Sequence, residues 1–193
     1  MSDGNKERPK VTAGLDIGDR YSYLCLIDTG SGEVVEEGRL RTTPEALRRR
    51  FASEPSLRIA IETGTHSPWV SRLLEECGHE VLVANARKTR LIYSNKRKTD
   101  EADAENLARL ARLDPKLLYP LKHRGEEGQA HMAIIRSRQA LVGSRTQLVN
   151  HVRAVKSFGA RLPKCPAASF HKRAKEHIPE ALLPALERVM NLD

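Results

Sequence analysis

The chain of 193 residues carries a formal net charge of +8, with 39% hydrophobic and 30% charged residues. This length can bury a hydrophobic core without disulfides, and the three cysteines are too widely spaced to indicate a disulfide framework or a zinc site. No apolar run approaches the ~20 residues that span a bilayer, and residues 1–10 contain no hydrophobic signal region. We therefore expect a cytoplasmic protein with a flexible N-terminus at 1–10 and no membrane partner.

The positive charge is concentrated in the second part of the chain. Residues 1–110 carry 18 basic and 18 acidic side chains, whereas residues 111–193 carry 15 basic and 7 acidic ones. A balanced first part joined to a basic second part is typical of a catalytic module with an arm that binds polyanions. A soluble protein that is merely basic would show the same distribution, so charge alone does not decide between these interpretations.

A first strand is predicted at residues 11–18, where apolar side chains alternate with small or polar ones. Asp16 lies on the face opposite Leu15, and its carboxylate is costly to bury unless a cation, a metal or several hydrogen-bond donors meet it. Two more strands are predicted at residues 21–27 and 33–42, separated by turn-forming residues. The three strands are expected to form an antiparallel meander.

Helices and strands alternate in the next part of the chain. Thr43 followed by Pro44 marks the start of a short helix, and a strand over 57–62 ends in Glu62. Ser67 and Pro68 cap another helix, which precedes a strand over 81–84. This order predicts an α/β fold in which helices cover a mixed sheet and the later strands run parallel to the first. Functional sites in such sheets gather at the carboxyl ends of the strands, where both strand-end acids lie.

A run of basic residues without any acid follows the last predicted strand. The run directly precedes a predicted helix over 100–113 that carries two further candidate acids, so we predict that the basic run contacts nucleic acid. Such a run is also typical of a solvated loop. The candidate contacts are Arg87, Lys88, Arg90, Lys96, Arg97 and Lys98.

Thr99 is a favourable N-cap for a helix over residues 100–113. Asp100 and Asp103 lie about 60° apart on this helix and straddle the stripe that holds Ala104. We therefore predict that both acids lie on the buried face of the helix. Each acid also has a structural explanation, because the helix dipole favours anions in the first turn.

Residues 114–193 are predicted to be helical. A long helix over about 129–161 carries apolar pairs every seven residues, and Val152, Val155 and Phe158 extend this apolar seam. Two short helical stretches begin near 167 and 179. The repeat predicts a coiled coil or a helical hairpin. Because the chain stops inside a helical pattern, we expect that it is a fragment or lacks a domain.

The four acids would meet if the helix over 100–113 packs near the strand ends. Four carboxylates at close range repel one another unless divalent cations compensate their charge. Ligands that are all oxygen point to Mg²⁺ or Mn²⁺, and two such ions clamp the attacking and leaving oxygens of a phosphodiester. The predicted reaction is phosphoryl transfer on nucleic acid. The predicted catalytic residues and metal ligands are Asp16, Glu62, Asp100 and Asp103.

Three motifs in this order resemble a known family. GLDIG at 14–18, IAIETG at 59–64 and KTDEADA at 98–104 look like the Asp-Glu-Asp-Asp catalytic domain of the insertion sequence 110 transposases. The resemblance implies a RuvC-like, ribonuclease-H-like catalytic domain over residues 11–113 and a helical coiled-coil segment, used in assembly, over 114–193. It also implies a magnesium-dependent DNA transposase or recombinase.

The same resemblance implies partners and a missing part. Members of the family act with a structured bridge RNA, encoded by the element, that bridges target and donor DNA, and we expect a homodimer or a higher homo-oligomer. Full-length members carry a C-terminal domain whose serine breaks the strand, and no serine of this chain matches that motif. We therefore expect a chain that is truncated, belongs to a decayed element or is completed by another chain.

Two other functions are open at this point. The segment 16–18, Asp-Ile-Gly, also resembles the first phosphate loop of sugar kinases, which would make the chain an actin-like phosphotransferase. The second Asp-x-Gly loop and the glycine pair for adenosine that this fold needs are missing. Alternatively, the chain is a non-catalytic module that binds RNA or DNA, and its acids are structural. An ATP-binding assay and a test of metal-dependent chemistry separate these functions from a recombinase.

Overall fold

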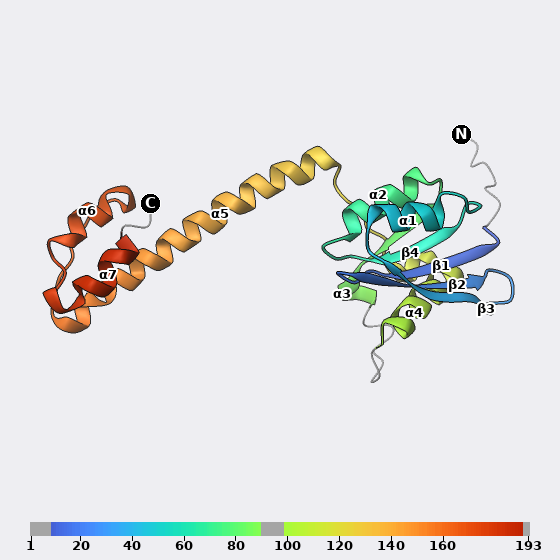
Figure 1. The fold of residues 1–193 in the computed structure, drawn as a ribbon, viewed down its shortest axis with the longest axis horizontal. Coiled ribbons are helices and arrows are strands. Elements are labelled where there is room, and N and C mark those ends of the chain that lie inside the picture. The colour runs from blue at the N-terminus through green and yellow to red at the C-terminus, as the bar shows by residue number, and fades with distance from the viewer. Residues whose placement is uncertain (1–8, 90–98, 191–193) are drawn as a thin grey trace. The chain divides into compact units, whose positions relative to one another are not determined.

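The computed structural model describes residues 9–89 and 99–190 (Figure 1). The chain forms two compact units, Met1–His123 and Arg124–Asp193, and each is described by itself. Most of the N-terminal segment that was expected to be flexible lies outside the described residues. Within the described ranges, every helix is too short or too polar to cross a bilayer.

A mixed five-stranded sheet forms the centre of the first unit. The strands lie in the order β3-β2-β1-β4-β5. Among them, only β2 runs against the others, as expected for the ribonuclease-H-like fold that the family resemblance implies. The structure confirms the predicted α/β class, the antiparallel meander and the parallel later strands. The strands are β1 (Val11–Asp16), β2 (Tyr21–Asp28), β3 (Val34–Arg41), β4 (Arg58–Glu62) and β5 (Glu80–Ala84).

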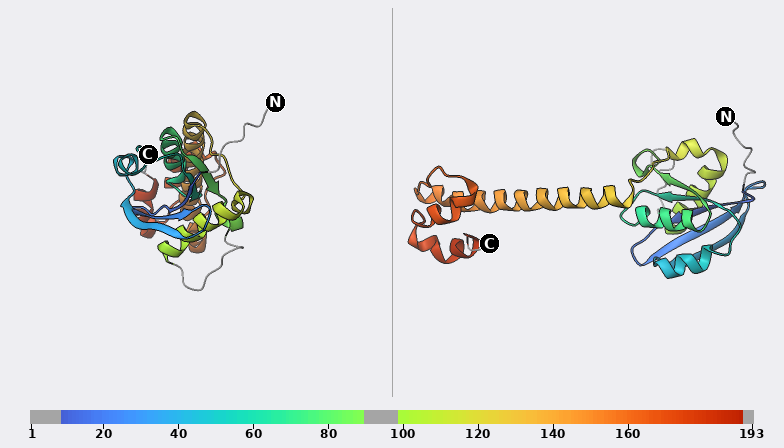
Figure 2. Two further views of the ribbon diagram at one scale, coloured as in Figure 1. Left: turned by 90° about the vertical axis from the view of Figure 1, so that its right-hand side faces the viewer. Right: turned by 90° about the horizontal axis from the view of Figure 1, so that it is seen from above.

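Helices cover both faces of this sheet (Figures 1 and 2). On one face, two helices share a core cluster with strand residues such as Leu15 and Ile61. On the other face, a single helix packs against β1 and its neighbours. Because successive strand residues point to opposite faces, Gly14 and Asp16 lie on the side of this single helix. The two helices of the first face are α1 (Pro44–Phe51) and α2 (Ser67–Glu76), and the single helix is α4 (Asp100–Leu113).

Side-chain caps fix the first residues of α1 and α4, as the sequence predicts. The Thr43 hydroxyl accepts a hydrogen bond from Ala46 N (3.3 Å), and the Thr99 hydroxyl accepts one from Ala102 N (3.2 Å). Helix α2 differs, because the side chain of its N-cap residue His66 makes no capping bond. The His66 imidazole is therefore available for other contacts.

The first unit continues beyond α4. The 3-10 helix η1 (Pro115–Leu118) buries Leu118, and Leu121 forms an isolated bridge with Val83 of β5. These contacts tie the chain to the sheet as far as His123, past the boundary expected at residue 113. The segment after α4 thus packs against β5, the strand at one edge of the sheet.

The second unit is entirely helical in its described part. Its long helix, predicted to reach residue 161, ends at Val152 instead. Val152 and Val155 are buried in a small core together with Phe170 and Leu186, which come later in the sequence. The two short helical stretches predicted near 167 and 179 are present. The elements are α5 (Glu126–Val152), η2 (Arg153–Phe158), η3 (Ala167–Ser169), α6 (Phe170–Lys175), η4 (Glu180–Leu182) and α7 (Leu183–Met190).

Helix α5 leaves apolar side chains exposed along much of its length. Ile134 and Leu141 are 67% and 72% exposed, and their neighbours Ile135 and Val142 are also exposed. These pairs recur at the seven-residue spacing that predicts a coiled coil. We call these four residues the α5 seam. Phe158, which was expected to extend the seam, lies in η2 and is exposed as well.

Candidate active site

Helix α4 packs directly on β1 because small residues meet there. A methyl group added at Gly14 would overlap the carbonyl oxygen of Ala104 and lie 2.6 Å from Ala108 N. All three residues are buried. Glycine is the residue whose missing side chain allows this close approach of two backbones. Gly14 therefore places the helix that carries two of the predicted acids.

Hydrogen bonds at the C-terminal end of α4 set its direction relative to β1. Arg112 Nε donates to Thr29 O (2.9 Å), and Thr29 N donates to Lys10 O, which lies directly before β1. The C-terminal end of α4 thus lies beside the beginning of β1. Its first turn, which contains Asp100 and Asp103, lies toward the end of β1. This is the sheet edge at which the two strand-end acids are found.

The contacts of α4 also show which strand each of its sides faces. Burial and the nearby Glu101 carboxylate raise the pKa of Tyr23, the β2 residue that pairs with the last residue of β1. On another side of the helix, Leu107 belongs to the same core cluster as Ala60 of β4. Asp103 precedes Leu107 by one helical turn, so it lies on the β4 side of α4.

A cavity of about 330 Å³ lies where β1 and β4 end, and Asp16 and Glu62 both line it. Both acids are partly buried. Asp100 lines a groove of about 740 Å³ between β2 and the start of α4, and Asp19 lines both spaces. The structure therefore brings Asp16 and Glu62 together in what we call the carboxylate cavity, and it places Asp100 in the adjoining groove.

The four predicted acids do not converge on one point. In the described parts of the chain, no three acidic, histidine or cysteine side chains lie close enough together to hold a metal ion. Asp103 is partly buried and lines neither the cavity nor the groove, and Asp100 is exposed. The prediction that both helix acids lie on the buried face is wrong for Asp100, because full burial along α4 begins only at Ala104.

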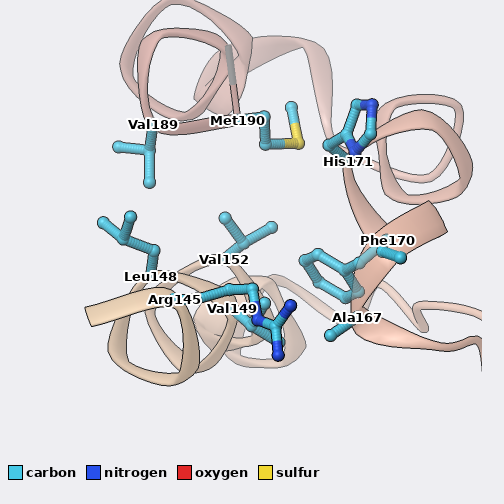
Figure 3. A pocket seen from close by; sticks show the side chains of 10 residues that line it. Arg145, Leu148, Val149, Val152, Ala167, Phe170, His171, Val189 and Met190 are labelled. Carbon is cyan, nitrogen blue, oxygen red and sulfur yellow. The ribbon is translucent and has the colours of Figure 1, made fainter. Parts of the chain in front are cut away.

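A different cavity, of about 230 Å³, lies in the second unit between α5, α6 and α7 (Figure 3). Its walls are mostly apolar, with Val152 and Met190 among them, and Arg145 and His171 are its charged or polar residues. None of the ten residues that line it is acidic, so their side chains offer no carboxylate to a divalent cation. The carboxylate cavity of the first unit is therefore the candidate active site.

The predicted nucleic-acid contacts are described only at their beginning. Arg87 and Lys88 lie in the short helix α3 (Ala86–Thr89) and are exposed. The Lys88 Nζ lies 4.8 Å from the ring centre of Tyr119. Helix α3 directly follows β5, which ends at the same sheet edge as β1 and β4. Outside the described residues lie Arg90, Lys96, Arg97 and Lys98.

Sequence reasoning missed several polar residues that line the carboxylate cavity. Asp19 follows β1, and Thr63 and His66 follow the strand that ends in Glu62. Ser67 also lines the cavity, although the sequence predicts only a capping role for it. The signal that could have found them is their position directly after two parallel strand ends.

A partly buried hydrogen-bond network holds the loop after β4 in place. Ser67 Oγ accepts a hydrogen bond from Gly64 N (3.0 Å) and lies 2.9 Å from His123 Nε2. Burial, with the charge of Arg72 as a second cause, lowers the pKa of His123 below its ordinary value of 6.5. The His123 imidazole is therefore neutral near pH 7, and it joins the end of the first unit to the wall of the cavity.

Similarity to known proteins shows the family of this chain. The family model of the DEDD transposases of insertion sequence 110, described as a transposase, matches residues 13–156. The chain belongs to the insertion sequence 110 family of DEDD transposases. The matched segment contains the four acids predicted from the sequence, Asp16, Glu62, Asp100 and Asp103.

This transposase-family chain is similar to one relative in sequence and to two solved structures in fold. “Putative transposase y4pF/y4sB” of Sinorhizobium fredii (strain NBRC 101917 / NGR234) is 33% identical over 154 residues, or 77% of this chain and 38% of the relative. “T. thermophilus RuvC in complex with Holliday junction substrate” is 15% identical, with a TM-score of 0.41 over 55% of this chain and 98% of that chain. A second structure, “Thermus thermophilus RuvC structure”, is 18% identical, with a TM-score of 0.35 over 54% of this chain and 96% of that chain. The chain thus spans well under half the length of the curated relative.

Proposed function

We propose that this chain supplies the catalytic acids of a DNA transposase or recombinase that works by metal-dependent phosphoryl transfer. The observation that supports this most strongly is the direction of α4, whose first turn reaches the sheet edge where β1 and β4 end. Asp16 and Glu62 lie at that edge, and Asp100 and Asp103 begin the helix. The proposed ligands thus come from three elements that end or begin at the same edge of the sheet.

The donor chemistry of these acids fits Mg²⁺ or Mn²⁺. Carboxylate oxygens are the ligands that such hard cations prefer, and Asp16 and Glu62 share a cavity. Asp103 lies on the β4 side of α4 and is therefore the helix acid better placed to join Glu62, while Asp100 lines the adjoining groove. When bound, the cations would neutralise the acids and stabilise the charge that develops on the phosphate.

Rigid backbone elements hold the proposed ligands. Asp16 is the last residue of β1, which is paired with β2 on one side and β4 on the other. Glu62 ends β4, which also lies between two strands. Asp100 follows the Thr99 cap directly, and the contact at Gly14 fixes the position of the helix. Sites built on strands and helices hold their ligands more accurately than sites on loops.

We infer that DNA is a partner of this edge of the molecule. Arg87 and Lys88 are exposed at the sheet edge where the parallel strands end, at the beginning of the basic segment. Basic side chains that neutralise phosphates make log affinity for duplex DNA fall with log salt, by about 0.9 per contact. The double variant Arg87→Ala, Lys88→Ala should therefore bind a DNA duplex more weakly and show a shallower salt dependence.

Further roles rest on the family resemblance. We propose that a structured bridge RNA guides the reaction, that two or more copies assemble through the α5 seam, and that a serine in the part of the family not spanned by this chain breaks the strand. The chain spans 38% of the curated relative, which leaves room for that part. If RNA is a partner, the element's own RNA should compete for the chain better than an unstructured RNA of equal length at equal salt.

Binding of Mn²⁺ tests the proposed metal site. In isothermal titration calorimetry, Asp16→Asn and Glu62→Gln should each reduce Mn²⁺ affinity by at least about 10-fold, because affinity follows the number of charged ligands. Asp103→Asn should act similarly, and Asp100→Asn more weakly because Asp100 is exposed. Glu105→Gln is the matched control, since Glu105 lies on the same helix but faces Cys25 of β2. Unchanged affinity in both strand variants would contradict the proposal.

A further inference from the structure

The loop between β4 and α2 places a histidine in the wall of the carboxylate cavity. His66 lines this cavity together with Asp16 and Glu62. It is the N-cap residue of α2, yet its side chain makes no capping bond. The imidazole contacts Trp69 on one side and Asp19 on the other.

The hydrogen bond from Trp69 fixes the tautomer of His66. The indole Nε1–H can only donate, and it lies 3.1 Å from His66 Nδ1, which must therefore accept. In the neutral ring the hydrogen is then on Nε2, which lies 3.3 Å from Asp19 Oδ1. His66 thus presents an N–H donor, and not a lone pair, at the cavity.

Packing against neighbouring residues fixes the orientation of the His66 Nε2–H group. Trp69 is partly buried against the core cluster of the first unit. Its ring meets the His66 imidazole edge to face, with the ring centres 6.0 Å apart and an interplanar angle of 89°. Ser67 Oγ holds the turn that precedes α2 by bonding both the N–H and the carbonyl of Gly64. The direction of the Nε2–H group is therefore set by the protein interior.

The present acceptor of this N–H group is easily displaced. The side chain of Asp19 is 91% exposed. Its separation of 3.3 Å from Nε2 is long for a hydrogen bond, and contacts between such exposed groups contribute little to stability. A phosphate oxygen that enters the cavity can take the place of Asp19.

We infer that His66 is a further substrate contact, which donates its Nε2–H to a non-bridging phosphate oxygen of the DNA strand at the carboxylate cavity. This inference rests on the proposed function. His66 acts as a neutral donor and not as a general acid, because an imidazolium would direct an Nδ1–H against the N–H of Trp69. No proton leaves the ring, and the hydrogen bond strengthens as negative charge develops on the phosphate oxygens.

Two substitutions of His66 test the contact, with a fluorescently labelled DNA duplex and Mn²⁺ as probes. His66→Ala should weaken duplex binding about 10-fold, the loss expected for one hydrogen bond to a charged group. His66→Gln keeps an N–H donor near the position of Nε2 and should retain affinity to within about threefold. Both variants should bind Mn²⁺ alone as the wild type does.

The salt dependence of duplex binding separates a neutral donor from a cation. A neutral side chain releases no counterions, so His66→Ala should leave the slope of log affinity against log salt unchanged. The matched control is Arg87→Ala, which should lower that slope by about 0.9. A slope that falls equally in both variants would show that His66 binds as an imidazolium and would overturn the inference.

Nitrogen-15 NMR of the imidazole reads the tautomer directly. In the wild-type chain we expect the Nε2–H form, with an Nε2 resonance that shifts when the duplex is added. Trp69→Phe keeps an aromatic ring but removes the N–H donor, so an Nδ1–H population should appear. An Nδ1–H tautomer in the wild type, or wild-type duplex affinity in His66→Ala, would overturn the inference.

The metal proposal and the histidine inference fail in different ways. If Asp16→Asn keeps wild-type Mn²⁺ affinity while His66→Ala weakens duplex binding, the metal site is wrong and the phosphate contact stands. If Asp16→Asn loses Mn²⁺ and His66→Ala does not change duplex binding, the metal site stands and the histidine inference is wrong. If His66→Ala itself lowers Mn²⁺ affinity, His66 is a metal ligand and the inference is also wrong.

Discussion

Helices α4 and α5 both follow apolar repeats, but they meet very different surroundings. Helix α4 has 14 residues, and five of them are buried. Helix α5 has 27 residues, all within the described part of the chain, and only Val152 is buried. A repeat therefore predicts a helix, but a packing partner decides whether that helix can hold a side chain in a fixed place. The buried residues of α4 are Ala104, Leu107, Ala108, Leu110 and Ala111.

The two helices also differ in the size of the residues on their apolar sides. Helix α4 meets β1 with Ala104 and Ala108, so the two backbones come close together. The α5 seam carries Ile134 and Leu141, which are large enough to fill the holes of another helix. Helix α4 is therefore suited to position acids beside the sheet, and α5 is suited to join a second chain.

Substitution of Gly14 by alanine should have the largest effect on stability. The new methyl group would overlap backbone atoms of α4, which can move only with the whole helix. We expect the free energy of unfolding to fall by roughly 3 kcal/mol or more, measured by urea denaturation followed by circular dichroism. Gly38→Ala on β3 is the matched control, because a methyl group there meets no atom within 4 Å. Equal stability of the two variants would contradict the close contact of α4 with β1.

A leucine on each helix sharpens the comparison further. Leu107 of α4 is 1% exposed, so Leu107→Ala should lower the free energy of unfolding by about 2–5 kcal/mol. Leu141 of α5 is 72% exposed, and Leu141→Ala should change it by less than about 0.5 kcal/mol. Urea denaturation at low protein concentration measures both effects without a contribution from assembly. A similar loss in the two variants would show that α5 packs within its own chain.

Local signals in the sequence predict most elements of the first unit. The alternation of apolar residues finds β1 and β4 and places Asp16 on the face opposite Leu15, because this pattern depends only on neighbours in the chain. Thr43 and Thr99 mark the starts of α1 and α4 for the same reason. The strand-end acids of the candidate site could therefore be found without a structure.

Contacts between distant segments decide what the sequence does not predict. The apolar spacing of α5 continues to Val155, yet the helix ends earlier because α6 and α7 supply a core for that side chain. Asp100 shares a helical stripe with Ala104 but lies outside the buried part of α4. The roles of Asp19 and His66 depend on one another and on Trp69, and no spacing rule connects these three positions.

Charges placed on the α5 seam test whether it joins a second copy of the chain. The double variant Ile134→Glu, Leu141→Glu should weaken self-association by at least about 100-fold, because each side chain contributes about 1.5–3 kcal/mol when it is buried. Sedimentation equilibrium over a range of concentrations measures the change. Gln147→Glu is the matched control, since 100° per residue places it on the opposite side of α5. A wild-type chain that stays monomeric at every concentration would remove the proposed role of the seam.

The smallest expected effect is a pH dependence of stability that arises from protonation of His123. Burial, and secondarily the charge of Arg72, lowers the pKa of His123 below 6.5, so the folded chain binds this proton less readily than the unfolded chain does. The stability that depends on the neutral ring is therefore fully present above pH 6.5 and is lost as the pH falls through the lowered pKa.

His123→Gln isolates this contribution, because a glutamine does not titrate and its amide can still bond the hydroxyl of Ser67, which lies 2.9 Å from His123 Nε2. Urea denaturation between about pH 7.5 and about pH 5.5 should show a shallower loss of stability in the variant than in the wild type. The same steepness in both chains would assign the pH dependence to other groups. A shallower loss would show that protonation of His123, which contacts Ser67 at the start of α2, destabilises the folded unit.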